Sequence, residues 1–276
     1  VSRPDETTAE EIAAYRAEYR RTNKGLLDSF EFWLEFRPDV LKRHKARTRH
    51  FRTVLEPDRP LVGILAAIHQ YAVAGFREGI AYEIRLAQSL GAKRTDILDT
   101  LSIAFIHSGH PGMYAAAAYA DHLRDYVDPP PGAGFPDRWA FEPGAFDSGM
   151  DFSRREASDD DMERLLAWYE RTLHEVPRHA SFLARYRPSL LKAYRDRYEH
   201  AIRDSLPKQM LPYLLLGHNV VRGFAGGIRE NVLLGRALGM TREQLLDSIC
   251  HAVLHAGVEA LDVVDEAAGD LLAETR

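Results

Sequence analysis

The feature that most constrains this chain is an internal repeat within its 276 residues. At an offset of 150 residues, identical residues recur in the same order, for example Arg37-Pro38 as Arg187-Pro188. Further along, the offset becomes 148 residues, and Gly75-Phe76 recurs as Gly223-Phe224. Chance is a poor explanation, because the order is preserved over most of each half. The sequence therefore predicts a tandem duplication of one structural unit.

The repeated unit is predicted to be helical throughout. Apolar residues recur every three or four positions rather than alternating, which is the period of an amphipathic helix. Capping-box patterns at Thr8-x-x-Glu11 and Thr241-x-x-Gln244 mark two helix starts. The predicted helices cover 8–23, 38–54, 60–74, 77–90, 95–108, 112–126, 159–173, 188–204, 207–222, 227–238, 242–256 and 259–273. We therefore predict an all-α fold.

The two repeats are predicted to span residues 1–127 and 158–276, with a linker at 128–157. The linker begins Asp128-Pro129-Pro130-Pro131, and its proline and glycine content argues against a helix. It also carries aromatic residues, which favour packing onto the protein over a freely floating segment. A strap and a lid over a pocket have the same composition, so both remain open.

The composition and charge exclude several functions. The net charge of −5 provides no basic surface for phosphates, so no nucleic-acid partner is expected. No apolar run approaches the ~20 residues of a membrane-spanning helix, so no membrane partner is expected. The segment Val1-Ser2-Arg3 shows no signal-peptide pattern, and a cytoplasmic location is therefore expected. Cys250 is the single cysteine, which excludes an intramolecular disulfide and Cys-x-x-Cys chemistry.

A segment punctuated by glycines recurs in both repeats. The first repeat has LAQSLG at 86–91 and IHSGHP at 106–111, and the second has LGRALG at 234–239 and LHAG at 254–257. These segments resemble the carboxymuconolactone decarboxylase family and its alkylhydroperoxidase D-like relatives. The resemblance implies packed helical hairpins that associate through shared interfaces. A homo-oligomer, as a dimer or trimer of the duplicated chain, is therefore expected.

The chain lacks the residues that the resemblance implies for redox chemistry. The peroxidase-like relatives carry two cysteines and a histidine on the helix before the first glycine. These align with Phe76, Gly79 and Glu83 here, and the histidine aligns with Asn231 in the second repeat. A dithiol peroxidase is excluded, because that reaction needs an attacking and a resolving thiol. The acid and base of an enzyme would lie elsewhere.

Three histidines are the leading candidates for acid–base catalysis. His107 and His255 occupy equivalent positions at a helix end, where an imidazole with a near-neutral pKa could act as acid or base. Each could instead complement the helix dipole. His110 precedes Pro111 at the start of the next helix, where a substrate anion could bind. The second repeat has Val258 there, which favours the first repeat as the active one.

A set of polar residues on the preceding helix could complete this site. Glu78, Tyr82 and Arg85 share one helix face, and Glu83 stands beside them. Glu78 or Glu83 would orient or deprotonate the substrate, while Tyr82 and Arg85 would bind its anion. The alternative is a solvated, ion-paired helix face.

Two further groups of residues have open alternatives. His69 and His218 lie in apolar helices. They either line the pocket and bind the substrate, or they are buried histidines that form hydrogen bonds within the protein. His251, His255 and Glu259 are spaced i, i+4, i+8 and could bind a divalent metal if the helix continued through them. Otherwise no metal and no cofactor are expected.

The leading functional prediction is a cofactor-free, cysteine-independent lyase of the decarboxylase or hydrolase type. Its substrate would be a small anionic molecule, a carboxylated lactone or a keto acid. The reaction class comes from the resemblance, and the residue roles come from helical spacing. The alternatives are a non-catalytic module that binds a small ligand or a protein, and a metal-dependent enzyme.

Overall fold

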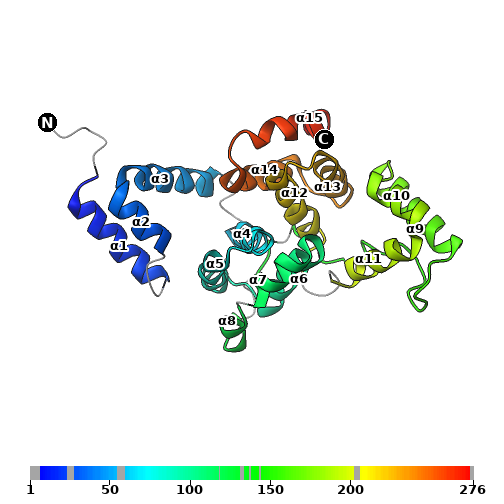
Figure 1. Cartoon of the computed structure of the whole chain (residues 1–276), viewed down its shortest axis with the longest axis horizontal. Helices are drawn as coiled ribbons and strands as arrows, with labels where there is room; N and C mark the ends of the chain where they lie inside the picture. The colour runs from blue at the N-terminus through cyan, green and yellow to red at the C-terminus, as the bar shows by residue number, and fades with distance from the viewer. Residues whose placement is uncertain are drawn as a thin grey trace. The chain divides into compact units, whose positions relative to one another are not determined.

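The computed structural model of the chain describes residues 7–23, 28–54, 60–117, 119–130, 134–136, 138–142, 144–201 and 206–273. Within these ranges the regular structure consists of helices, so the all-α prediction is confirmed (Figure 1). The chain divides into two compact units, Val1–Pro57 and Asp58–Arg276. No helix in the described ranges is long and apolar enough to span a bilayer.

The Val1–Pro57 unit contains three helices: α1 (Ala9–Asn23), α2 (Asp28–Phe36) and α3 (Pro38–Val54). The predicted capping box begins α1, since the Thr8 amide donates to Glu11 Oε2 at 2.9 Å and the Glu11 amide donates to Thr8 Oγ1 at 3.2 Å. The Lys42 ammonium joins α3 to the same Glu11 carboxylate at 2.7 Å. One glutamate therefore caps α1 and also holds α3 against it.

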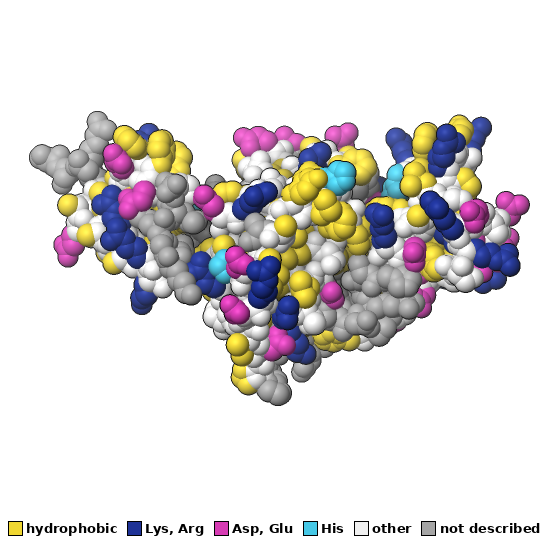
Figure 2. Space-filling view, turned by 60° about the horizontal axis from the view of Figure 1, so that its bottom comes forward, with side chains coloured by type: hydrophobic (Ala, Val, Ile, Leu, Met, Phe, Trp, Pro, Cys, Tyr) yellow, Lys and Arg dark blue, Asp and Glu magenta, His cyan; other side chains and the backbone are white. Residues whose placement is uncertain are grey.

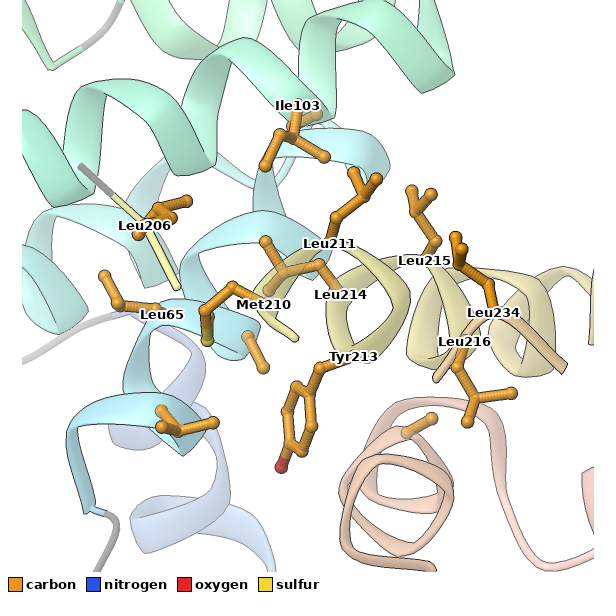
Figure 3. Packing of buried hydrophobic residues seen from close by; sticks show 14 of the residues in the cluster. Leu65, Ile103, Leu206, Met210, Leu211, Tyr213, Leu214, Leu215, Leu216 and Leu234 are labelled. Atoms are coloured by element: carbon orange, nitrogen blue, oxygen red, sulfur yellow. The ribbon is translucent and has the colours of Figure 1, made fainter. Parts of the chain in front are cut away.

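The Asp58–Arg276 unit contains the remaining helices: α4 (Pro60–Ala74), α5 (Arg77–Ser89), α6 (Arg94–Ser108), α7 (His110–Ala117), α8 (Ala120–Arg124), α9 (Asp159–Leu173), α10 (Arg178–Tyr186), α11 (Pro188–Ala201), α12 (Met210–Arg222), α13 (Ala225–Ala237), α14 (Arg242–Ala256) and α15 (Ala260–Ala273). Helices α4 and α12 pack against each other, and each is surrounded by helices of its own half. Burial on several sides explains why both helices are apolar around most of their circumference. Leu65 of α4, Ile103 of α6 and Leu211 of α12 belong to the core at this junction (Figure 3).

The helices begin at positions that follow the spacing of the sequence repeat. Helices α1, α2 and α3 begin 150 residues before α9, α10 and α11, respectively. Helices α5 and α6 begin 148 residues before α13 and α14. The short helices α2 and α10 were not predicted, and the predicted helix 112–126 is divided into α7 and α8.

The described part of the 128–157 linker packs onto the helices of the Asp58–Arg276 unit, to which it belongs. The side chains of Trp139, Phe146 and Met150 are buried in its core. The Ala140 carbonyl accepts a hydrogen bond from the Lys208 amide at 2.9 Å, next to the start of α12. The expectation that this segment packs onto the protein is therefore confirmed.

Candidate active site

A cavity of about 190 Å³ opens among the helices of the second half of the chain. Helices α9 to α13 provide almost all of its wall, and α6 adds one residue, His107. The lining residues are His107, Trp168, Tyr169, Leu173, His179, Tyr194, Arg195, Tyr198, Leu215, Asn219, Phe224, Gly227, Glu230, Asn231 and Leu234. The cavity therefore combines aromatic and aliphatic walls with a small group of titratable and amide side chains, as binding sites for small molecules commonly do.

One side of the cavity is fixed by a buried ion pair on α11. Arg195 Nε donates to Glu199 Oε1 at 2.8 Å, and both side chains are 3% exposed. Arg195 Nη2 donates to the Phe146 carbonyl at 2.6 Å, and the guanidinium lies 3.9 Å from the centre of the Trp168 ring. The Ser148 amide donates to the same Glu199 oxygen at 3.2 Å. The linker thus helps to hold the cavity wall, and the charge of Arg195 is already matched.

Glu230 of α13 has the most chemically informative position in the cavity. Burial raises the pKa of its carboxyl to about 7; Arg195 opposes this shift and Glu175 adds to it. His179 Nδ1 of α10 lies 3.7 Å from Glu230 Oε2, and burial lowers the pKa of this imidazole. Near neutral pH, Glu230 can therefore both accept and release a proton.

His107 reaches the cavity from the end of α6. Its Nε2 atom is buried and has no hydrogen-bond partner among the described residues. Burial lowers its pKa to about 3, with smaller contributions from His218 and His179. The expectation of a near-neutral pKa at His107 is therefore wrong, because the ring is enclosed and faces other imidazoles rather than a carboxylate. His107 can form hydrogen bonds as a neutral ring, but it does not store a proton at neutral pH.

Asn231 lines the cavity, and one atom of its amide lacks a hydrogen-bond partner among the described residues. Its Nδ2 atom donates to the Gly227 carbonyl at 2.8 Å, while its buried Oδ1 atom has no partner in the described structure. A Cβ atom on Gly227 would lie 2.5 Å from Asn219 Cγ, which explains the need for glycine at this position. The equivalent Gly79 is crowded in the same way by Phe76.

His69 and His218 form a row with His107 but do not line the cavity. The ring centres of His69 and His218 are 6.0 Å apart, and those of His218 and His107 are 6.4 Å apart. His69 is fully buried, and its two ring nitrogens have no hydrogen-bond partner among the described residues. Burial lowers the pKa of His69, and it lowers that of His218 to about 4. The row therefore consists of neutral imidazoles.

The polar set predicted on the first repeat does not line this cavity. Glu78 and His110 are exposed, at the starts of α5 and α7, respectively. Glu83 is buried and Tyr82 half-buried on α5. Arg85 Nε of the same helix donates to the Ala81 carbonyl at 3.3 Å. Their proposed catalytic and anion-binding roles stay predictions.

The proposed metal ligands are not assembled. Helix α14 ends at Ala256, and Gly257 has a φ of +86°, so the helix does not continue to Glu259. No group of three or more histidine, cysteine, aspartate or glutamate side chains in the described ranges could hold a metal ion. The alternative site of His251, His255 and Glu259 is therefore wrong. The His255 ring instead lies with its centre 5.1 Å from that of Tyr71, outside the cavity described here.

Most residues of this cavity were missed from the sequence. The wall formed by α9, α10 and α11 lies outside 234–239 and 254–257, the segments of the second half that carry the family resemblance. One usable signal was present, because Tyr194 and Tyr198 are spaced i, i+4 and therefore share a helix face. Glu230 was not among the predicted site residues, because its partial burial is not visible in the sequence.

The comparisons with known proteins agree with the fold. The sequence matches no protein-family model, and it matches no curated protein at a significant level. A similar solved structure is that of a protein from Burkholderia xenovorans described as a candidate gamma-carboxymuconolactone decarboxylase subunit. The TM-score is 0.58 at 15% sequence identity, over 94% of this chain and 97% of that chain. This similarity shows that the chain has a carboxymuconolactone decarboxylase-like fold.

Proposed function

We propose that the chain is an acid–base enzyme of the lyase or hydrolase class that acts on a small lactone or keto compound in this cavity. The observation that supports this most strongly is Glu230, whose half-buried carboxyl has a pKa of about 7. Such a pKa suits a general acid or base at neutral pH, and shifts of this kind concentrate at functional sites. The aromatic wall and the neutral imidazole of His107 complete a cavity suited to a small organic substrate.

In this proposal, the ionised Glu230 takes a proton from a carbon next to the substrate carbonyl, or from a water molecule that attacks a lactone. The negative charge that then develops on the carbonyl oxygen requires a hydrogen-bond donor. His107 lines the cavity, its Nε2 atom has no hydrogen-bond partner among the described residues, and the neutral ring can provide that donor. His179, next to Glu230, can exchange the proton with it. No cysteine takes part.

Turnover by a Glu230→Gln variant tests this function. Candidate lactones and keto acids would be incubated with the protein, and products identified by mass spectrometry. We expect the variant to lose about a hundredfold or more in kcat/KM, because general acid–base catalysis contributes about that much. In the wild type, kcat/KM should rise with pH through about 7 as Glu230 ionises.

Glu266→Gln provides a matched control, because Glu266 is an exposed glutamate on α15 outside the cavity. It should retain wild-type turnover. If Glu230→Gln also retained wild-type turnover, Glu230 would not be the catalytic base. Tight binding of a substrate analogue without any product would instead support the alternative of a non-catalytic binding module.

We also propose that the chain arose by tandem duplication and that it associates with further copies of itself. The matching offsets of sequence identities and helix starts support the duplication. Hydrophobic side chains exposed among charged ones on the Asp58–Arg276 unit support association (Figure 2). Phe182, Tyr186 and Leu190 are examples, each close to half exposed or more. Light scattering coupled to size-exclusion chromatography would give the mass of the assembly and test this.

A further inference from the structure

We infer that copies of this chain associate by packing α2 of one copy against α10 of a second copy, with the acidic face of α2 opposite the basic face of α10. This inference names the surfaces of the proposed self-association and rests on that proposal. It is independent of the proposed acid–base chemistry.

Helices α2 and α10 occupy equivalent positions in the sequence repeat and expose the same pair of aromatic side chains. In α2, Phe32 is 53% exposed and Phe36 is 60% exposed. At the offset of 150 residues they correspond to Phe182 and Tyr186 of α10, which are 59% and 48% exposed. The members of each pair are spaced i, i+4 and share a helix face, and their ring centres are 5.1 Å apart in α2 and 4.9 Å apart in α10. Exposed aromatic side chains grouped in this way are typical of an interaction surface.

The charged residues beside these aromatic pairs differ between the two helices. Where α2 has Asp28, Glu31 and Glu35 in its sequence, α10 has Arg178, Ser181 and Arg185. Glu35 and Arg185 are both exposed, and each follows the first aromatic residue of its pair by three positions, so each lies on the aromatic face. Neither of them forms an ion pair with another described residue. The two faces therefore carry unmatched charges of opposite sign at equivalent positions.

The residue that follows each helix adds to this difference. Arg37 follows α2, and its Nη2 atom lies 2.9 Å from Asp39 Oδ2, so its charge is matched locally. The equivalent Arg187 follows α10, but Ser189 stands where the first repeat has Asp39. The basic charge at the end of α10 therefore has no equivalent carboxylate to neutralise it.

The charges make the two faces complementary to each other and not to themselves. Two α2 faces in contact would bring together two copies of Glu35, and two α10 faces would bring together two copies of Arg185, and like charges at an interface are unfavourable. A second copy of the chain provides the matching face for each helix. In a two-fold dimer the α2–α10 contact occurs twice, and in a ring it occurs once per copy, so it suits a closed assembly.

Charge reversal on each face tests this contact. Glu35→Arg places an arginine on both faces, and Arg185→Glu places a glutamate on both. Each variant alone should associate about tenfold or more weakly than the wild type, measured by sedimentation velocity over a concentration series. Glu266→Arg on α15 and Arg94→Glu at the start of α6 reverse other exposed charges and should associate as the wild type does.

A mixture of the two variants provides the sharper measurement. Each face of Glu35→Arg finds a face of opposite charge on Arg185→Glu, so an equimolar mixture should associate within about threefold of the wild type. The double variant Glu35→Arg/Arg185→Glu should also recover, because it exchanges the charges of the two faces within one chain. Both positions are exposed, so the variants should fold, and circular dichroism would verify this.

Three results would overturn the inference. If both single variants associated as tightly as the wild type, another surface would join the copies, and the proposed self-association would stand. If neither the mixture nor the double variant recovered, the two faces would not contact each other. A wild-type chain that stayed monomeric at about 100 μM would reject the self-association together with this contact. Turnover is measured separately, so none of these results bears on the role of Glu230.

Discussion

Replacement of Glu230 by glutamine should make the protein more stable at alkaline pH and leave its stability nearly unchanged at acidic pH. The carboxyl is half-buried, and its pKa in the folded protein is about 7 against an ordinary value of 4.5. The folded state therefore holds this proton more tightly than the unfolded state does. The protonated Glu230 carboxyl therefore makes its full contribution to stability below about pH 4.5, and this contribution is lost as the pH rises through about 7.

The size of this effect follows from the shift in pKa. A difference of about 2.5 units, at 1.36 kcal/mol per unit, corresponds to about 3 kcal/mol. The Glu230 side chain is 20% exposed, so partial hydration makes this value an upper limit. Glutamine has a similar shape and never ionises. The variant should therefore match the wild type near pH 4.5 and exceed its free energy of unfolding by up to about 3 kcal/mol near pH 8.5.

Urea unfolding at a series of pH values would measure this difference. In a Trp33→Phe background, fluorescence comes from Trp139 and Trp168, which both belong to the Asp58–Arg276 unit and report on the part that contains Glu230. The buried histidines alter the pH dependence of both proteins alike, so they cancel in the difference. Glu266→Gln, an exposed change on α15, should stay within about 0.5 kcal/mol of the wild type throughout. If the free energies of unfolding of Glu230→Gln and the wild type changed in parallel with pH, the raised pKa of Glu230 would be refuted.

Two further predictions concern the scaffold. Lys192→Ala should lower the free energy of unfolding by about 3–5 kcal/mol, because the buried Asp161 carboxylate, which lies 2.7 Å from Lys192 Nζ, would lose its cation. Urea unfolding would measure this loss. A loss below about 1 kcal/mol would contradict the prediction. Gly227→Ala should lower the free energy of unfolding by about 1–3 kcal/mol, because the added Cβ atom would clash with the Asn219 side chain. Gly226→Ala should lower it less in the same assay, because a Cβ atom there would have no neighbour closer than 3.5 Å. Equal losses for the two variants would contradict the prediction.

The helical architecture could be predicted largely because its signals are local. The Thr241–Gln244 capping box begins α14 as predicted, with the Gln244 amide donating to Thr241 Oγ1 at 3.2 Å. A capping box depends only on four consecutive residues, so no tertiary information is needed. Helices α2 and α10 contain nine residues each, which is too short for a clear period. Helices of this length form mainly because packing stabilises them.

The site could be predicted only in part, because the sequence does not show which helices of the two halves face one cavity. His107, a candidate from the sequence, does line the cavity, and its catalytic role stays a prediction. Its imidazole, however, meets Tyr194 and Tyr198 of α11 rather than the carboxylates of its own half. Glu230 lies between Arg229 and Asn231 in the sequence and looks like a surface residue. Its raised pKa arises from burial, which is a property of the folded chain.

In a chain whose two halves share residues at a constant offset, positions that differ between the halves can be more informative about chemistry than positions that agree. Gly79 and Gly227 agree, and both are explained by crowding from a neighbouring side chain. At the same offset of 148 residues, Tyr82 in the first half corresponds to Glu230 in the second. The repeated glycine therefore preserves the packing of α5 and α13, while the substituted position provides the carboxyl group of the cavity. His107 belongs to the other half, so this cavity requires residues from both halves of the chain, and neither repeat alone would contain the complete site.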